Sequence, residues 1–325
     1  MPTPSDPLRV MVAGLGAFGG EHLGRLIGRA DVTVVGIADK SPAALARGQR
    51  LHGMAECHDD PLGMIDASDA DAVIVATPAD AHVEIGMHAL KRGLCVLLEK
   101  PIATSAAAGR ALLEAEPMST GFVLPGHVLR FSRDHQRLVE VVRSGQIGET
   151  IYVNSRRYRD DSHVVRYPAD DPILMTLIHD IDLALWITGS DFRSVVARRV
   201  GGPLSRSITT SQAMTTNGVA CELRTAWTFA SGDLPHDRVE VVGARGSVEL
   251  VVEEGLQVHC GGRRIDFLPS EADDSLSNEH EHFFSCVRNR SLKPAVDLRQ
   301  AISGLRLADA MTESLRTGRE VFLSD

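Results

Sequence analysis

The chain has 325 residues, more than one ordinary domain of about 100–200 residues, so we expect two domains. Hydrophobic residues make up 43% and charged residues 24%, the balance of a soluble globular protein, and no apolar run approaches the roughly 18–20 residues of a membrane helix. The net charge of −9 argues against a nucleic-acid-binding surface, which requires clustered positive charge.

The first 125 residues alternate strand and helix patterns. Apolar runs predict buried strands at residues 8–13, 32–38, 72–76 and 95–98. Helical patterns lie between and after them, at residues 18–29, 81–92 and 105–116. Runs that are apolar along their whole length and separated by helices indicate a parallel sheet covered on both faces. We therefore predict a doubly wound α/β domain over residues 1–125.

The pattern changes after about residue 125. Helices are predicted at 133–143 and 172–187, on either side of a long strand at 150–158. Strand patterns then follow one another from about 195 to 268, with Asn217-Gly218 as a type I′ hairpin signal. Two helices and a short strand close the chain, at 278–288, 298–316 and 320–323. We predict that residues 126–325 form an α+β domain for substrate binding and oligomerisation, with a mostly antiparallel open sheet and helices on one face.

The cysteines indicate the redox compartment. They are Cys57, Cys95, Cys221, Cys260 and Cys286. Their odd count, wide spacing and lack of a CxxC motif argue against a disulfide framework or a thiolate zinc site, and favour a reducing cytoplasm. The N-terminal sequence has neither an apolar signal core nor a twin arginine, which also favours a cytoplasmic location.

A GxGxxG sequence directly follows the first strand and opens a helix, and Asp39 lies 20 residues beyond Gly19 at the end of the second strand. Gly14 allows the tight turn, Gly16 lets a pyrophosphate approach the helix N-terminus, and Gly19 lets the helix pack closely. Asp39 can accept hydrogen bonds from ribose hydroxyls and repels a 2′-phosphate, so we expect NAD. Lys40 offsets part of that repulsion, which leaves NADP possible, and the glycine pattern alone also fits FAD.

Glu99-Lys100-Pro101 directly follows the strand predicted at residues 95–98, in the parallel sheet. Ligands of such sheets bind at the carboxyl ends of the strands, so we expect Lys100 at the cofactor crevice rather than on a solvated loop. A lysine can exchange a proton with a sugar hydroxyl while hydride leaves the same carbon. The position therefore predicts a general acid–base role.

The helix predicted from Pro172, with Asp171 as its N-cap, presents a mixed face. Helical spacing places on one side of it Met175, His179, Asp182 and Trp186. A lone histidine on a helix is more often structural than catalytic. Asp182 on the same face favours a functional role, because it can orient His179 or accept a substrate hydroxyl.

Several of these motifs occur together and in one order along the chain. They are Gly14–Gly20 (GLGAFGG), Asp39, Thr77-Pro78 with His82, Glu99-Lys100-Pro101, Ile178–Asp182 (IHDID), and Glu281-His282-Phe283 followed by Ser314–Arg319. Over nearly its whole length the chain thus resembles the glucose–fructose oxidoreductase/inositol dehydrogenase (Gfo/Idh/MocA) family. The resemblance implies an NAD(P)-binding Rossmann domain over residues 1–125. It also implies oxidation of a secondary alcohol of a sugar, cyclitol or nucleotide sugar, or the reverse reduction.

The resemblance, with the patterns above, implies a set of site residues. The catalytic residues are expected to be Lys100, His179 and Asp182. The cofactor is expected to contact Gly14, Gly16, Ala17, Phe18, Gly19, Asp39, Lys40, Thr77, Pro78, His82, Glu99 and Lys100. The substrate is expected to contact His127, Arg130, Tyr158, Thr176, His179 and Asp182.

This chain departs from the family pattern four residues before His179. Relatives carry a substrate-binding aspartate there after a glycine-rich stretch, whereas this chain has Met175 after Asp170-Asp171-Pro172. Either Thr176 or a carboxylate from elsewhere substitutes for that aspartate, or the pocket is more apolar than in the inositol enzymes.

Basic residues surround the segments expected to face the cofactor, namely His127, Arg130, Arg159, His163 and Arg166. They form either a solvated surface or a site for an anionic or phosphorylated substrate, since arginine matches carboxylate and phosphate geometry. The clusters at 57–60 and 279–282 lack the spacing of a closed metal site, so we interpret them as structural and expect no metal.

Three functions are compatible with these residues. They are a dehydrogenase of a small sugar-like substrate, a non-catalytic NAD-binding sensor and an NAD-dependent glycoside hydrolase. The presence of both Lys100 and His179 favours the first. We expect no nucleic-acid or membrane partner. The uncovered face of the second-domain sheet is expected to carry alternating Val, Leu and Ala, which predicts a homodimer or homotetramer formed through that sheet.

Overall fold

The computed structural model describes residues 6–167, 170–202, 207–229 and 234–323. The chain divides into two compact units. Unit 1 runs to Val128 and includes Leu276–Ile302, and unit 2 comprises Leu129–Ser275 and the chain from Ser303 onward. The boundary predicted after residue 125 placed 276–302 in the second domain, whereas their contacts group them with unit 1. As a statement about domains that fold independently, that boundary stays a prediction.

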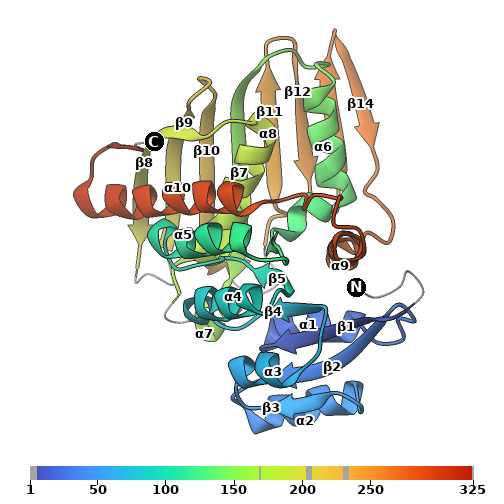
Figure 1. Ribbon diagram of the computed structural model, residues 1–325. Coiled ribbons are helices and arrows are strands. Elements are labelled where there is room, and N and C mark those ends of the chain that lie inside the picture. The colour runs from blue at the N-terminus through green and yellow to red at the C-terminus, as the bar shows by residue number, and fades with distance from the viewer. Residues whose placement is uncertain (1–5, 168–169, 203–206, 230–233, 324–325) are drawn as a thin grey trace. The chain divides into compact units, whose positions relative to one another are not determined.

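Unit 1 is built on a parallel sheet in the order β3-β2-β1-β4-β5-β6 (Figure 1). The strands are β1 (Leu8–Ala13), β2 (Val32–Ala38), β3 (Glu56–His58), β4 (Ala72–Val75), β5 (Cys95–Glu99) and β6 (Val123–Gly126). Side chains of the central strands are buried on both faces, which is why these runs show no alternation. The strand order reverses between β1 and β4, and the loops after these two strands border the crevice where such sheets bind ligands.

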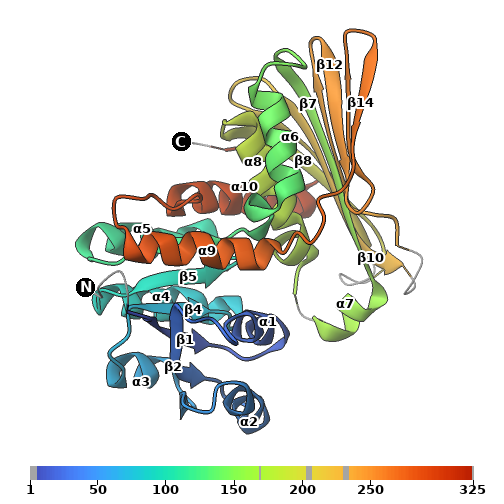
Figure 2. The ribbon, with the colours of Figure 1, turned by 90° about the vertical axis from the view of Figure 1, so that its right-hand side faces the viewer.

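Helices cover both faces of this sheet, with α1 and α2 on one face and α3, α4 and α5 on the other (Figure 2). They are α1 (Ala17–Arg25), α2 (Pro42–Leu51), α3 (Pro61–Ala67), α4 (His82–Lys91), α5 (Ala106–Ala115) and, from the C-terminal half, α9 (Ser275–Arg288). Side-chain caps explain where several of them begin. Ser41 accepts from the N–H of Ala44, and the Asp60 carboxylate accepts from two N–H groups of the first turn of α3.

Unit 2 contains a nine-stranded sheet in the order β14-β13-β12-β11-β7-β10-β9-β8-β15. The strands are β7 (Thr150–Asp160), β8 (Phe192–Gly201), β9 (Ser207–Thr215), β10 (Ala220–Phe229), β11 (Arg238–Gly243), β12 (Gly246–Val251), β13 (Gly255–Cys260), β14 (Arg263–Phe267) and β15 (Val321–Phe322). Neighbouring strands are antiparallel except β7 and β10, which pair in parallel.

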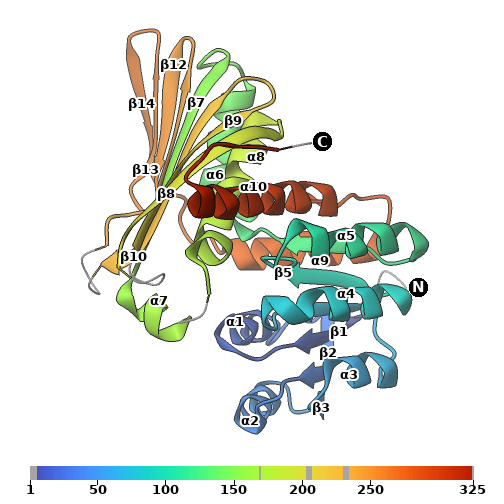
Figure 3. The ribbon, with the colours of Figure 1, turned by 90° about the vertical axis from the view of Figure 1, so that its left-hand side faces the viewer.

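The helices of unit 2 are α6 (Arg133–Arg143), α7 (Asp161–Arg166), α8 (Ile178–Thr188) and most of α10 (Leu298–Thr317), with a π-helical segment, η4 (Ile173–Leu177), directly before α8. Both α6 and α8 lie against the same face of the sheet (Figure 3). The predicted fold class is therefore confirmed: a Rossmann-type parallel sheet and a mostly antiparallel open sheet with helices on one face. Among the described residues, no helix is long and apolar enough to cross a membrane.

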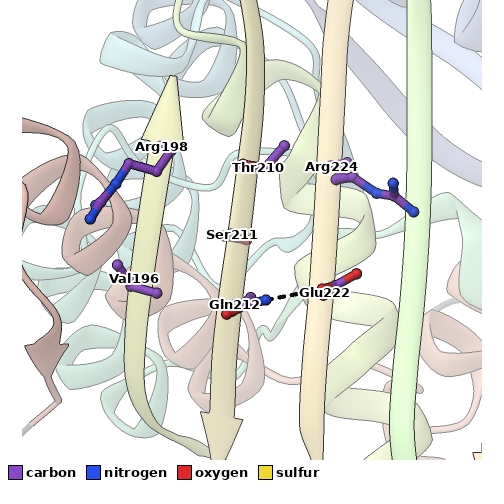
Figure 4. A pocket seen from close by; sticks show the side chains of 7 residues that line it. All are labelled: Val196, Arg198, Thr210, Ser211, Gln212, Glu222 and Arg224. Carbon is purple, nitrogen blue, oxygen red and sulfur yellow. Dashed lines mark hydrogen bonds between the residues drawn. The ribbon is translucent and has the colours of Figure 1, made fainter. Parts of the chain in front are cut away.

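The uncovered face of the unit 2 sheet differs from the expected one. Its positions on β8, β9 and β10 carry mainly polar and charged side chains, among them Arg198, Gln212, Glu222 and Arg224 (Figure 4). The expectation of an apolar face was wrong because the apolar residues of these strands, such as Ala213 and Leu223, alternate onto the opposite face, where they are buried.

The hairpin predicted at Asn217-Gly218 joins β9 to β10, but its turn is not type I′. Of the two residues, only Gly218 has a positive φ, +90°, and its N–H donates to the carbonyl of Thr215 at 3.1 Å. A type I′ turn needs positive φ at both central residues, so one left-handed glycine closes this hairpin instead.

Candidate functional site

The glycine loop after β1 tolerates no side chain at two of its positions. Gly14 has φ of +86°, and a Cβ atom there would lie 2.5 Å from the carbonyl oxygen of Ala76 in the loop after β4. A Cβ atom on Gly19 would lie 1.9 Å from the carbonyl oxygen of Gly14. Gly14 therefore allows the loops after β1 and β4 to touch at the point where the strand order reverses. Gly19 allows the first turn of α1 to pack directly against the backbone of Gly14.

Gly16 differs from these two glycines because a Cβ atom there would meet nothing within 4 Å. It is the N-cap of α1, and no side chain among the described residues caps this helix end. The unused N–H groups of the first turn and the helix dipole both favour an anion. The loop thus fits the pyrophosphate of a dinucleotide. Ala17 and Phe18 open the helix, and the Phe18 ring is 40% exposed.

Asp39 lies beside this loop at the end of β2. Its Oδ2 accepts from the N–H of Leu15 at 2.6 Å, and its Oδ1 accepts from the N–H of Ser41 at 2.7 Å. Each carboxylate oxygen retains a second lone pair, which is what a ribose hydroxyl requires. Lys40 beside it is exposed.

His82 links the loops that follow β4 and β5. Its Nε2 lies 2.7 Å from the carbonyl oxygen of Thr77, and its Nδ1 lies 2.8 Å from that of Pro101. Burial lowers the pKa of His82, so the neutral ring donates to one of the two carbonyls at a time. In the structure His82 thus connects the two loops, and its contact with a cofactor stays a prediction.

Thr77 offers a second sign of a ligand. Its Oγ1 is buried and has no hydrogen-bond partner among the described residues. Buried hydroxyls are normally hydrogen-bonded, so an unsatisfied one at the carboxyl end of β4 fits a polar group of a bound cofactor. Pro78, next in the chain, is exposed.

Glu99 and Lys100 stand at the carboxyl end of β5, the strand next to β4. Glu99 is 5% exposed, and its Oε2 accepts from the backbone N–H of Lys100 at 3.2 Å. Its Oε1 lies 3.0 Å from Nε2 of His22, on α1. Lys100 is half-buried, and its peptide bond to Pro101 is cis. These residues belong to unit 1, as do the glycine loop and Asp39.

His179 belongs to unit 2, where it is half-buried in the first turn of α8. The next residue, Asp180, fixes this turn to the sheet. Its carboxylate accepts two hydrogen bonds from Arg157 of β7, at 3.0 and 3.2 Å, and one from Ser155. Arg157 also pairs with Asp237. Burial raises the pKa of Asp180, whereas the charge of Arg157 acts in the opposite direction.

Asp182 and Arg130 are joined to each other. The carboxylate accepts from both Nε and Nη2 of the guanidinium, at 2.9 and 2.7 Å, and both side chains are buried. The sequence suggested instead that Asp182 orients His179 or accepts a substrate hydroxyl, and that Arg130 contacts the substrate. A bidentate ion pair between them gives both a structural task, and their catalytic and substrate roles stay predictions.

The other predicted substrate contacts lie at different depths. Thr176 is buried in η4, and its hydroxyl accepts from Nε1 of Trp227 at 2.9 Å. His127 is buried after β6, in unit 1, whereas Tyr158 is half-buried on β7. Arg159 pairs with Asp237 at 3.0 Å.

Sequence reasoning missed the hydrogen bonds of His22 and His280. His22 is bonded both to Glu99 and to His280, and both histidines are buried in unit 1. The sequence suggests that the run 279–282 is structural and that Glu281 and His282 belong to a family motif, without naming a partner for any of its residues. In the structure His280 contacts His22, Glu281 pairs with Arg29, and His282 accepts from the N–H of Ala295. The placement of His22 three residues after Gly19 was the available signal, but it did not identify a partner 258 residues away.

Comparison with known proteins gives two matches to family models. Residues 8–127 match the model of an oxidoreductase family with an NAD-binding Rossmann fold (GFO_IDH_MocA), and residues 139–323 match that family's C-terminal alpha/beta domain. Inositol 2-dehydrogenase 2 of Saccharopolyspora erythraea is 30% identical over an alignment of 331 positions, gaps included, which covers 96% of this chain and 94% of the relative. An inositol 2-dehydrogenase of Klebsiella pneumoniae (strain 342) is 35% identical over 59% of this chain and 57% of the relative.

Solved structures show the same fold. An oxidoreductase from Agrobacterium radiobacter, in complex with NAD+, L-tartaric acid and magnesium, superposes with a TM-score of 0.88 at 18% identity, covering 97% of this chain and 98% of that one. Scyllo-inositol dehydrogenase from Lactobacillus casei, with bound NAD(H) and scyllo-inositol, has a TM-score of 0.83 at 19% identity, covering 98% and 100%. The family models and the sequence relative confirm the resemblance predicted from the motifs, and the solved structures confirm the fold.

Proposed function

Because this chain belongs to the Gfo/Idh/MocA family of oxidoreductases, we propose that it is an NAD-dependent dehydrogenase that oxidises a secondary hydroxyl group of a cyclitol or a related sugar. The position of Lys100 carries the proposal. It follows β5 at the carboxyl edge of a sheet whose neighbouring loops offer a bare helix N-terminus, an aspartate for ribose and an unsatisfied threonine hydroxyl.

The predicted site residues then each have a chemical task. NAD, when bound, supplies the acceptor for the hydride. The N–H groups of α1 hold its pyrophosphate, and Asp39 accepts hydrogen bonds from its adenosine ribose. Nζ of Lys100 accepts the proton from the substrate hydroxyl. Such a general-base role contributes about 10²–10⁴-fold to the rate. We assign His179 the second proton-handling task, as the family resemblance implies.

The arginine pairs of unit 2 favour a neutral polyol over an anionic substrate. Arg130 is paired with Asp182 and Arg159 with Asp237, so part of the charge and hydrogen-bonding capacity of each guanidinium is already used by a carboxylate of the same unit. A relative named as an inositol 2-dehydrogenase, similar over 96% of this chain, supports the same substrate class.

A substrate panel tests the proposal. Purified protein is mixed with NAD or NADP and, separately, with inositol isomers, aldoses and sugar acids, and formation of the reduced cofactor is followed by absorbance. We expect NADH formation with at least one inositol isomer and much slower reduction of NADP. NAD binding without reduction by any substrate would favour the sensor function, and release of a sugar from a glycoside without net NADH would favour the hydrolase function.

We also infer a cytoplasmic location. All five cysteines are free thiols in the structure, and Cys57 among them is exposed. Free, exposed thiols persist in a reducing compartment.

A further inference from the structure

A buried row of hydrogen bonds leads from α9 to the end of β5. Nε2 of His280 lies 2.8 Å from Nδ1 of His22, and Nε2 of His22 lies 3.0 Å from Oε1 of Glu99. Both histidines are 0% exposed. All three residues belong to unit 1, although they come from α9, α1 and β5. We call this row the His280–His22–Glu99 series.

When Oε1 of Glu99 accepts from His22, the two hydrogen bonds of the series fix the direction in which each is donated. A carboxylate only accepts, so Nε2 of His22 carries the hydrogen of that bond. Nδ1 of His22 then has a lone pair and accepts from the N–H at Nε2 of His280. Each ring is thereby held in one tautomer, with every donor pointing toward Glu99.

The other oxygen of Glu99 faces the catalytic end of the strand. Oε2 accepts from the backbone N–H of Lys100 at 3.2 Å. Because its two oxygens are engaged by different elements, the side chain of Glu99 ties the first residue after β5 to α1 and, through His22, to α9. A buried carboxylate needs such donors, so loss of the His22 hydrogen bond would favour movement of the Glu99 side chain.

The surroundings leave Glu99 little freedom. A Cβ atom on Gly126 of β6 would lie 2.8 Å from Oε1 of Glu99, so that position admits no larger residue without displacing the carboxylate. Glu279, beside His280 on α9, is also buried, and neither of its oxygens has a hydrogen-bond partner among the described residues. Burial, together with the nearby carboxylate of Glu99, raises the pKa of Glu279 well above its usual range.

We propose that His22 and His280 are positioning residues for the reaction. The series transmits the position of α9 to Glu99 and, through the backbone of Lys100, fixes where the lysine is presented at the carboxyl end of β5. This role rests on the proposed dehydrogenase function. It adds two residues to the site that contact neither the substrate nor the cofactor in the proposal.

The test compares two substitutions of His280. His280→Gln retains an N–H donor close to the position of Nε2, whereas His280→Leu removes the donor and keeps an apolar side chain of similar bulk. With NAD and the inositol isomer that the panel identifies, we expect His280→Leu to lower kcat by about 10–100-fold, the effect of a slightly misplaced catalytic group, while KM and the Kd of NAD stay within about threefold. His280→Gln should stay within about threefold of the native kcat.

Two further variants separate positioning from general loss of packing. Val287→Ala removes buried volume from the same helix outside the series, and it should leave kcat within about twofold although it lowers the melting temperature. Gly126→Ala displaces Glu99 from the side of β6 and should lower kcat in the same way as His280→Leu. An unchanged kcat in His280→Leu would overturn the proposal, as would equal losses in His280→Leu and Val287→Ala.

A measurement without substrate keeps the outcome independent of the proposed function. In protein labelled with ¹⁵N, the amide resonance of Lys100 should shift in His280→Leu and stay in place in Val287→Ala, and the ring of His22 should show the Nε2–H tautomer. If the protein oxidises no polyol but shows these shifts, the proposed function is contradicted and the positioning role is supported. A Lys100 amide that does not respond to His280→Leu would remove the positioning role even in an active enzyme.

Discussion

Asp39 decides between the two nicotinamide cofactors in this account. Its carboxylate is fixed beside the glycine loop by the N–H groups of Leu15 and Ser41, so it presents its charge where the adenosine ribose is expected. Asp39→Ser removes the repulsion of a 2′-phosphate and leaves the exposed Lys40 to attract it. We expect the ratio of kcat/KM for NAD to that for NADP to fall by at least about tenfold, or roughly 1.4 kcal/mol. Native protein that prefers NADP would contradict this role.

Two glycines of the same helix start give a matched pair of variants. A Cβ atom on either Gly16 or Gly20 meets nothing within 4 Å, so alanine should be accepted at both positions without steric strain. Gly16 faces the expected pyrophosphate, and Gly16→Ala should raise the Kd of NAD by about tenfold without lowering the melting temperature. Gly20→Ala should leave the Kd within about twofold and stabilise α1, since alanine is favoured over glycine in a helix by about 1 kcal/mol. Equal NAD affinity in both variants would contradict a pyrophosphate site at Gly16.

Single residues were predictable where the chemistry is local. The glycine loop, Asp39 and Lys100 follow from residue types at fixed short spacing, and the structure places them at neighbouring carboxyl ends of one sheet. Partner choices were not predictable. Asp182 meets Arg130 from 52 residues away and Thr176 meets Trp227 from 51, and no local pattern in the sequence encodes such pairs.

At the scale of elements, the helix that carries His179 was predicted in extent but not in geometry. Asp171 caps its start as expected, accepting from the N–H of Ile173 at 2.8 Å. The first five residues, Ile173–Leu177, then form a π-helical segment before α8 begins. A π-turn changes which residues share a face, so the predicted alignment of Met175 with His179 does not follow from α-helical spacing. Apolar residues fit either kind of helix, and the sequence therefore gave no sign of the change.

His135 of α6 makes the stability of unit 2 sensitive to acid. Burial, helped by the charge of Arg157, lowers its pKa to about 3, whereas Asp237 and Asp134 act in the opposite direction. The unfolded chain binds a proton at this histidine below its ordinary pKa of about 6.5, and the folded chain does so only near pH 3. Its contribution to stability is therefore complete above about pH 6.5 and falls by about 1.4 kcal/mol per pH unit down to pH 3.

His135→Gln tests that acid sensitivity. Glutamine does not titrate and keeps a polar group near Ser132, to which the histidine is bonded at 3.0 Å. Urea unfolding at several pH values should show a slope of stability against pH that is smaller than in the native protein by about 1.4 kcal/mol per pH unit between pH 4 and 6. Identical slopes in the two proteins would show that His135 is not buried in its neutral form.

At the scale of the whole molecule, we expect association through the uncovered face of the unit 2 sheet. That face carries a shallow hollow lined by Val196, Arg198, Thr210, Ser211, Gln212, Glu222 and Arg224 (Figure 4). Glu222 accepts hydrogen bonds there from Gln212 at 3.1 Å and from Tyr152 at 2.8 Å. Charged and polar groups of both kinds on one face suit a self-complementary interface about a two-fold axis.

Light scattering tests this assembly. Native protein at micromolar concentration should have the mass of a dimer or tetramer, and Arg224→Glu, which adds a negative charge beside Glu222, should lower it. Arg50→Glu, an equal change of charge at an exposed position of α2 in unit 1, should leave the mass unchanged. A native protein that is monomeric under these conditions would contradict the prediction.

The architecture was the most predictable level, because hydrophobic periodicity records which faces are buried. Continuous apolar runs marked the parallel strands of unit 1, and successive strand patterns marked the sheet of unit 2. The association of 276–302 with unit 1 was not predictable, since a helix with one buried face fits either unit equally well. The polar character of the uncovered sheet face was missed because alternation shows that two faces differ without showing which one the helices cover.

Transfer of deuterium from a polyol carbon to the cofactor tests the proposed hydride transfer and the role of Lys100. Protein is incubated with NAD and with an inositol isomer deuterated at its ring carbons, and the mass of the reduced cofactor is measured by mass spectrometry. We predict that the native protein forms NADH that carries one deuterium. Lys100→Ala should form it about 10²–10⁴-fold more slowly, and the Kd of NAD should stay within a few-fold of the native value. Unlabelled NADH, or labelled NADH formed equally fast by Lys100→Ala, would contradict hydride transfer from a polyol carbon assisted by this lysine.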